Sequence, residues 1–168
     1  MAKKITGCVF DLDGTLADTA PDIALALNKS LNDFGLSQVP LESAKEMIGN
    51  GIPVLVRRAL FHIEAPEDLA TDVITSMLAY SRKYYCEKST LMHGVKDCLE
   101  GLKKRGIPMS ICTNKDETVA QMVVSALGLS SYFNAIVGSR PELAKKPDPS
   151  MLQIAAGAIS SPMKTTMM

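Results

Sequence analysis

The sequence contains few of the features that mark nucleic-acid-binding, membrane or secreted proteins. It has no tryptophan, and its basic and acidic residues are equal in number, so the formal net charge is zero. A zero net charge gives no electrostatic basis for binding nucleic acid or an anionic membrane surface. No apolar run approaches the ~20 residues that span a bilayer, and the charged N-terminus leads straight into a short apolar segment rather than a signal peptide. We therefore expect a cytoplasmic globular protein with no nucleic-acid or membrane partner; nothing in the sequence indicates its oligomeric state.

Cysteine is sparse and irregularly placed. The four cysteines stand at positions 8, 86, 98 and 112, and none belongs to a Cys-x-x-Cys pair. Zinc sites and dithiol redox sites are therefore not indicated. Cys8 and Cys112 fall in apolar segments, where we expect small buried side chains.

Two aspartates directly follow the first apolar segment. Residues 5–10 are typical of a short buried strand, and Asp11 and Asp13 come next, followed by Gly14 and Thr15. Open α/β sheets bind their ligands at the carboxyl ends of the strands. Two carboxylates at such a position can hold a hard cation such as Mg²⁺. They can also divide the work of a nucleophile and of a proton donor and acceptor.

The pattern Asp-x-Asp-Gly also has simpler interpretations. Asp and Gly are frequent in turns for local backbone reasons, and a similar pattern opens the calcium loop of the EF-hand. That loop follows a helix and requires Glu at its twelfth position. Here the preceding segment is strand-like, and the twelfth position is Asp22. A calcium loop is therefore disfavoured, and a plain turn stays open as the alternative.

The rest of the chain predicts two regions of different architecture. Residues 19–88 carry four helical patterns without a strand, at 21–34, at 41–48, from 53 and from 66. From residue 89 onward, strands at 107–112 and 135–138 alternate with helices at 94–104, 116–127 and 147–158. Such alternation is typical of a parallel, doubly wound α/β sheet. We therefore expect an α/β core of residues 1–18 and 89–168, with a helical domain of residues 19–88 inserted into it.

Polar residues also follow the other two strands of the predicted core. Thr113 and Asn114 follow the second strand, and Lys146 follows the third after a loop. A carboxylate, a hydroxyl and an ammonium at one sheet edge suit phosphoryl transfer, which depends on positioning and electrostatic stabilisation. Each residue has a structural alternative as well. Thr113 and Asn114 could cap the helix that begins near Asp116, and Lys146 could be a solvated surface charge.

These motifs make the chain similar to the haloacid dehalogenase-like hydrolase superfamily. Asp11-Leu12-Asp13-Gly14-Thr15-Leu16 matches the first motif of that superfamily, Ile111-Cys112-Thr113-Asn114-Lys115 the second, and Lys146-Pro147 the third. Residues 48–52 and 94–114 resemble superfamily members that act on small phosphorylated metabolites such as 2-phosphoglycolate. The resemblance covers essentially the whole chain and implies a Rossmann-like core with an inserted α-helical cap.

The resemblance implies a Mg²⁺-dependent phosphomonoester hydrolase that works through an aspartyl-phosphate. Asp11 would be the nucleophile, and Asp13 would protonate the leaving alkoxide and then activate water. The second aspartate favours phosphate chemistry, because halide displacement needs no acid for its leaving group. Mg²⁺ would be held by Asp11 and Asp13, while Thr113 and Lys146 would bind the transferring phosphoryl group.

Further residues are implied as substrate-binding. They are Gly14, Thr15 and Asn114 in the core and Gly49, Asn50 and Gly51 in the helical region. Arg57 is a weaker candidate, whose alternative is a solvated helix face. Other functions stay open: a sugar-phosphate phosphatase or phosphomutase of the same superfamily, or a phosphate-binding protein without catalysis.

One motif of the superfamily has no match after Lys146. It is an acidic pair that completes the metal site beyond a fourth core strand. Residues 163–168 resemble the start of that strand, so we expect the C-terminal core strands to be missing and the chain to be part of a longer protein or a shortened one. A shortened chain would bind Mg²⁺ weakly, and its first strand would expose an apolar edge.

Overall fold

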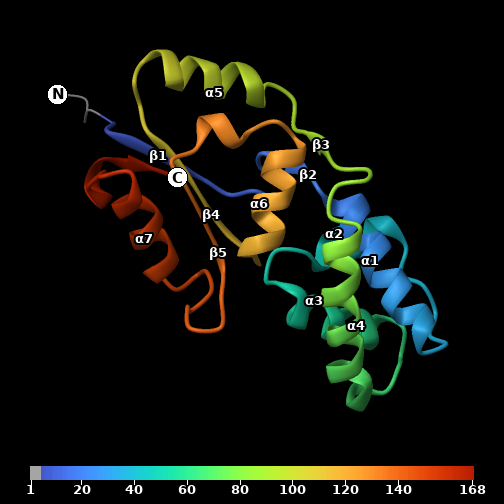
Figure 1. Cartoon of the computed structure of the whole chain (residues 1–168). Coiled ribbons are helices and arrows are strands. Elements are labelled where there is room, and N and C mark those ends of the chain that lie inside the picture. Colours follow the sequence, from blue (N-terminus) through green and yellow to red (C-terminus); the bar gives the residue numbers. More distant parts are fainter. Residues whose placement is uncertain (1–4) are drawn as a thin grey trace. The chain divides into compact units, whose positions relative to one another are not determined.

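The computed structural model describes residues 5–168, which divide into two compact units (Figure 1). One unit comprises residues 5–17 together with Thr90–Met168, and the other comprises Asp18–Ser89. The chain passes between the units at two short strands, β2 (Ala17–Asp18) and β3 (Thr90–Leu91). These two strands pair with each other. The second unit is therefore an insertion into the sequence of the first.

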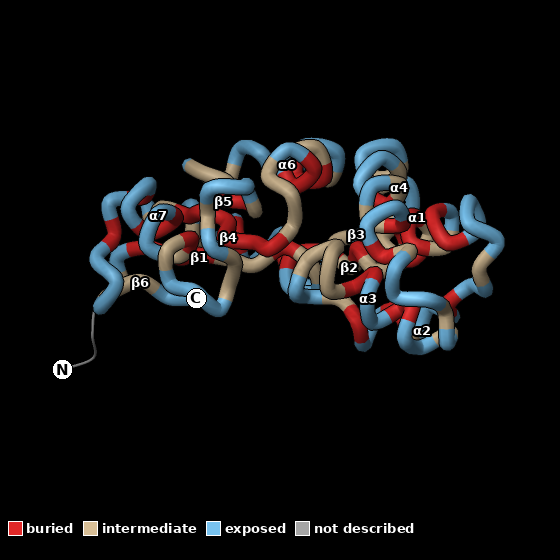
Figure 2. The backbone as a smooth tube through the Cα atoms, turned by 90° about the horizontal axis from the view of Figure 1, so that it is seen from below, coloured by how far each residue is buried: buried red, intermediate tan, exposed pale blue. Residues whose placement is uncertain are grey.

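The first unit is built on a four-stranded sheet with the order β5-β4-β1-β6. Its strands are β1 (Gly7–Phe10), β4 (Met109–Asp116), β5 (Ala135–Ser139) and β6 (Thr166–Met167), and every pair is parallel. Figure 2 shows that the chain is buried through β1 and most of β4. Strands covered on both faces have runs of apolar residues rather than alternating ones, as residues 8–10 of β1 and 111–112 of β4 do. The predicted α/β fold with a parallel sheet is confirmed.

Helices cover both faces of this sheet. They are α5 (Val95–Lys104), α6 (Glu117–Ala126) and α7 (Ser150–Ala158), with short 3₁₀ turns at Ser130–Tyr132 and Met163–Thr165. Helix α6 leads from β4 outward to β5, whereas α7 leads back across the sheet to β6. Right-handed connections therefore place α6 and α7 on opposite faces, as Figure 1 shows. On the α7 face, Val9, Cys112 and Val137 of the sheet pack against Met151 and Ala155.

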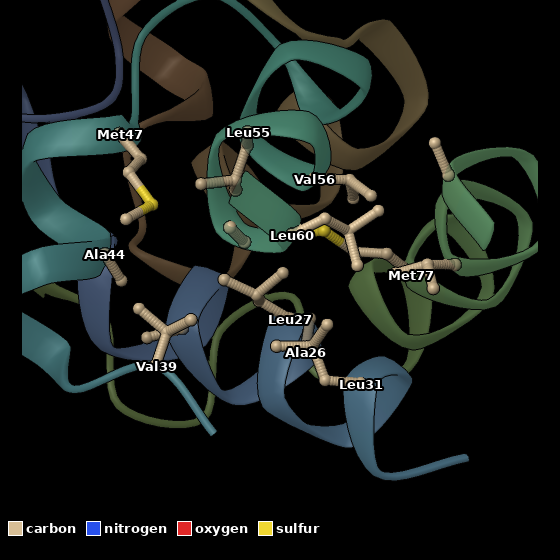
Figure 3. Close-up of a cluster of buried hydrophobic side chains, with 14 residues drawn as sticks. Ala26, Leu27, Leu31, Val39, Ala44, Met47, Leu55, Val56, Leu60 and Met77 are labelled. Atoms are coloured by element: carbon tan, nitrogen blue, oxygen red, sulfur yellow. The ribbon is translucent and has the colours of Figure 1, made fainter. Parts of the chain in front are cut away.

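The regular structure of the second unit is helical, apart from its first residue, Asp18, which belongs to β2. It contains α1 (Ala20–Asp33), α2 (Leu41–Met47), α3 (Ile52–His62), a 3₁₀ turn at Glu67–Leu69 and α4 (Ala70–Lys83). Leu27, Leu31, Leu60 and Met77 are at most 1% exposed and meet at its centre (Figure 3). These residues recur at the three- and four-residue spacing from which the helices were predicted. No helix within residues 5–168 has the length and apolarity needed to cross a membrane.

Several element boundaries differ from those predicted by a few residues, among them those of β4 and α7. The strand expected at 107–112 begins at Met109 and continues to Asp116, because Asp116 pairs with Ser139 beyond an irregularity in the ladder. The helix expected from Pro147 begins at Ser150. A residue that precedes proline is disfavoured in helical conformation, and Asp148 precedes a second proline. The Asp148 carboxylate instead accepts a hydrogen bond from the Ser150 amide at 2.9 Å.

The end of the chain does form a strand beside β1, as expected. Gly7 is aligned with Thr166 and Cys8 with Met167 in parallel register, and the Thr6 amide donates to the Thr165 carbonyl at 3.0 Å. The expectation that β1 would expose its edge is therefore wrong along Gly7 and Cys8, because β6 pairs with that edge.

Candidate active site

A tight turn after β1 places Asp11 and Asp13 next to each other at the carboxyl end of the sheet. Gly14 adopts a left-handed conformation, φ +74°, which glycine adopts without steric cost. The carbonyl of Leu12 accepts hydrogen bonds from the amides of residues 15–17 at 3.0–3.3 Å. Leu12 itself is fully buried, whereas Asp11 and Asp13 on either side of it are only partly buried. The turn therefore orients the acidic pair.

Lys146 is paired with Asp11. Its ammonium nitrogen lies 2.8 Å from Asp11 Oδ2 and donates to the carbonyl of Cys112 at 2.9 Å. The other oxygen of Asp11, Oδ1, accepts a hydrogen bond from the Leu12 amide at 2.8 Å. The Lys146 side chain is 18% exposed, which excludes a freely solvated surface charge. The structure thus brings together the carboxylate and the ammonium that the sequence separates by 135 positions.

Asn114 holds the backbone of Lys146. Its Oδ1 accepts from the Lys146 amide at 2.9 Å, and its Nδ2 donates to the Lys146 carbonyl at 3.2 Å. Neither Asn114 nor Thr113 caps the following helix, because Asp116 does so by accepting from the Val119 amide at 3.1 Å. The sequence predicts Asn114 as a substrate-binding residue, whereas both ends of its amide contact Lys146 in the structure. Asn114 therefore fixes the loop that carries Lys146.

Thr113 and Lys115 lie two residues apart on β4. Thr113 is 1% exposed, and its hydroxyl accepts from the Lys115 amide at 3.3 Å. The Lys115 ammonium lies 3.0 Å from Asp13 Oδ1, and the two side chains are 12% and 16% exposed. Lys115 belongs to the second motif, but no role was predicted for it from the sequence. The two-residue period of a strand was the available signal, since it places Lys115 on the same side as Thr113.

Cys112 lies directly behind this charged group. Burial raises the pKa of its thiol. The charge of the nearby Lys146 lowers this pKa, and the charge of Asp11 raises it. The thiol is therefore neutral near pH 7 and serves as packing rather than as a nucleophile. Cys8 and Cys112 are both buried, which confirms the expectation from the sequence.

Residues 8–168 match the model of one protein family, described as haloacid dehalogenase-like hydrolase. The chain belongs to this family. A phosphoglycolate phosphatase of Colwellia psychrerythraea is 36% identical over 152 residues, which cover 88% of this chain and 67% of that protein. One of Pseudomonas savastanoi pv. phaseolicola is 38% identical over 149 residues, covering 86% of this chain and 54% of that protein. The chain thus spans between about half and two thirds of the length of these relatives.

A solved structure of the same family has the same fold. It is described as a predicted phosphoglycolate phosphatase from Haemophilus somnus 129PT, and it superimposes with a TM-score of 0.88 at 30% identity. The match covers 99% of this chain and 76% of that one. The match therefore includes the residues of both compact units and those of the carboxyl edge described above.

The donor set of this haloacid dehalogenase-like chain fits a hard cation. The Asp11 carboxylate and the Asp13 backbone carbonyl are oxygen donors, the type of ligand that Mg²⁺ prefers. Within residues 5–168, no group of three His, Cys, Asp or Glu side chains is placed to hold a metal. Mg²⁺ commonly uses one or two carboxylates and keeps several waters, so two protein ligands are compatible with it.

The remaining predicted residues belong to the helical unit. Gly49 and Gly51 flank Asn50 in the connection from α2 to α3, and both glycines have positive φ, +121° and +83°. Asn50 is exposed. Arg57 lies on α3, is largely exposed, and has its Nε 3.9 Å from a Glu67 carboxylate oxygen. The structure thus shows Arg57 in the setting of its simpler alternative, a solvated helix face.

Proposed function

We propose that this chain hydrolyses small phosphomonoesters through an aspartyl-phosphate on Asp11, with 2-phosphoglycolate as the first substrate to test. The arrangement that carries the proposal is the pairing of two carboxylates with two ammonium groups at the carboxyl edge of the sheet. The Lys146–Asp11 distance is 2.8 Å and the Lys115–Asp13 distance is 3.0 Å. The names of the relatives that are 36% and 38% identical support the choice of substrate.

Asp11 acts as the nucleophile in this proposal. Its carboxylate oxygen attacks the phosphorus while the bond from phosphorus to the leaving oxygen breaks. A carboxylate and a phosphate repel each other, and the Lys146 ammonium offsets this repulsion because it contacts Asp11 directly. Asn114 keeps Lys146 in place through its two hydrogen bonds to the Lys146 backbone.

Asp13 acts as the acid and the base. It donates a proton to the departing alkoxide and then removes one from the water that attacks the phosphorus of the aspartyl-phosphate. This second attack releases inorganic phosphate and regenerates the Asp11 carboxylate. The buried Thr113 hydroxyl and the turn of Gly14 and Thr15 complete the group that contacts the phosphoryl oxygens.

Mg²⁺ would be held by the Asp11 carboxylate and the Asp13 carbonyl. When bound, it supplies positive charge to the phosphoryl oxygens. We also propose that the helical unit acts as a cap over substrate, as the family resemblance implies, with Gly49, Asn50 and Gly51 contacting its non-phosphate end.

Release of inorganic phosphate tests the proposal. The chain is assayed with Mg²⁺ against 2-phosphoglycolate and a panel of sugar phosphates, with product analysis for isomerised sugar phosphates. We expect Asp11→Asn to lower turnover by at least about 10³-fold, because a carboxamide is a poor nucleophile. The matched control is Asp97→Asn, an exposed position on α5, which should leave turnover unchanged. Chelation should abolish activity and added Mg²⁺ should restore it.

Three results would count against the proposal. Unchanged activity in Asp11→Asn would remove the nucleophile and with it the mechanism. Isomerised sugar phosphate without net phosphate release would indicate a phosphomutase. Binding of a phosphomonoester without turnover would indicate a phosphate-binding protein.

A further inference from the structure

Lys115 is paired with Asp13 in the site, but the proposed mechanism gives it no contact with the substrate. It lies on β4 two residues beyond Thr113, and its ammonium is 3.0 Å from Asp13 Oδ1. Lys146 already offsets the charge of Asp11. Lysine is among the residues least often removed from solvent, yet the Lys115 side chain is only 12% exposed. This burial indicates that Lys115 has a function in addition to its pairing with Asp13.

The partner of Lys115 fixes where its charge lies relative to a substrate. A proton donor acts within about 2.6–3.2 Å of the atom that it protonates. When Asp13 donates its proton from Oδ1, the Lys115 ammonium is within about 6 Å of the leaving oxygen, since it is 3.0 Å from that Oδ1. The ammonium is then close enough to the leaving alcohol to contact a polar group attached to it.

A carboxylate on the leaving alcohol matches this distance. If the carboxylate is attached to the carbon next to the ester oxygen, bond lengths of about 1.2–1.5 Å put its oxygens about 3 Å from the ester oxygen. A further contact of about 2.8 Å then reaches the ammonium. An ammonium has three donor hydrogens, so Lys115 can keep Asp13 and bind such a carboxylate at the same time.

We propose that Lys115 is a specificity-determining residue that binds an anionic group on the leaving alcohol. It selects phosphomonoesters with a carboxylate on the carbon next to the ester oxygen over those without one. The inference rests on the proposed function, because the roles of Asp11 and Asp13 define which end of the substrate Lys115 faces. It goes beyond that function because it states that one side chain of β4, Lys115, discriminates between leaving groups.

The test compares two substrates that differ only at the proposed contact. 2-Phosphoglycolate carries the carboxylate, and ethyl phosphate carries a methyl group in its place. Both kcat/KM values are measured for the unmodified chain, Lys115→Met, Lys115→Arg and the control Lys104→Met, an exposed lysine on α5. Dissociation constants of both compounds are measured by calorimetry in the Asp11→Asn background, with and without Lys115→Met.

We expect the unmodified chain to favour 2-phosphoglycolate and Lys115→Met to reduce that preference by about 10- to 100-fold. This range corresponds to the loss of one hydrogen bond between charged groups. Both substrates lose some activity in Lys115→Met because Asp13 loses its partner, so the ratio between substrates is the decisive quantity. Lys115→Arg should retain most of the preference, and Lys104→Met all of it. Circular dichroism of each variant verifies that it is folded.

Every other result either supports or overturns the proposed role of Lys115. Equal losses for both substrates, or no preference in the unmodified chain, overturn the inference and leave the proposed function standing. If no phosphomonoester is hydrolysed, the proposed function fails, and the dissociation constants decide about Lys115. A preference in binding that Lys115→Met removes supports the anion contact, and a preference that persists refutes it.

Discussion

Asp22 offers a quantitative test of how the helical unit is held together. It lies in the first turn of α1 and is 3% exposed. Its two carboxylate oxygens accept from the Lys88 amide at 2.9 and 3.0 Å, and Oδ2 also accepts from the amide and hydroxyl of Ser89 at 2.8 and 2.6 Å. One side chain thus ties the segment that leads into β3 to the beginning of α1.

The expected cost of Asp22→Ala follows from these three donors. Hydrogen bonds to a charged group contribute about 1.5–3 kcal/mol each. The sum overestimates the cost, because Lys88 is exposed and its amide can bind water once Asp22 is removed. The three bonds also share one acceptor, so their energies do not add. We therefore expect the free energy of unfolding to fall by about 2–4 kcal/mol, and by about 1 kcal/mol for Ser89→Ala.

Urea unfolding followed by circular dichroism measures these energies, and hydrogen exchange reports on the Lys88 and Ser89 amides. The double variant Asp22→Ala with Ser89→Ala should lose less than the sum of the single losses by at least about 0.5 kcal/mol. Glu46→Ala, an exposed position on α2, should change stability by less than about 0.5 kcal/mol. A loss below about 1 kcal/mol for Asp22→Ala, with unchanged amide exchange, would refute the reasoning.

Three further predictions concern the first unit. Asn114→Ala removes both hydrogen bonds to the Lys146 backbone and should lower kcat by about 10²-fold through displacement of the ammonium; an unchanged rate of phosphate release would contradict this. Gly138→Ala would place a Cβ 2.3 Å from the Glu117 Cα and should reduce the free energy of unfolding by about 1–3 kcal/mol in urea titrations, whereas a neutral effect would show that the strand can shift. Burial raises the pKa of the Cys112 thiol above its unfolded value of 9.0, so the native state keeps a proton that the unfolded chain releases. The contribution of this protonated thiol to stability is complete below pH 9.0 and is lost as the pH rises further. Cys112→Ala should therefore reduce the loss of unfolding free energy between pH 7 and pH 10. An equal loss in Cys112→Ala and the unmodified chain would show that the Cys112 thiol does not cause it.

The sequence was most informative where local periodicity and burial coincide. The apolar run before Asp11 indicated a buried strand, and β1 is that strand. The spacing of Leu27 and Leu31 indicated the helix whose apolar face now packs in the core of the second unit. Gly35, with φ +67°, follows the end of α1 as its position in the pattern predicted. These features depend on neighbours within a few residues, so no long-range contact was needed to infer them.

Boundaries were less accurate where long-range pairing or two nearby prolines compete with the local pattern. The sequence ended the second strand before Thr113, but pairing with β5 continues it to Asp116. The family resemblance implied Asn114 as a substrate-binding residue. Only the fold shows that the backbone of Lys146, 32 positions away, lies within reach of both ends of that amide.

The sequence alone determined the family, because the residues of the acidic motif that carry the resemblance are adjacent in the chain. It also determined the parallel α/β architecture, since strand and helix periods alternate along the chain. The tertiary structure alone decided which ammonium pairs with which carboxylate. The motifs select Lys146 over Lys145, and Lys115 is marked only by its two-residue spacing from Thr113. The structure shows that the ion pairs join Lys146 to Asp11 and Lys115 to Asp13. Pairing of this kind depends on where separate strands end in space, and sequence spacing does not encode that position.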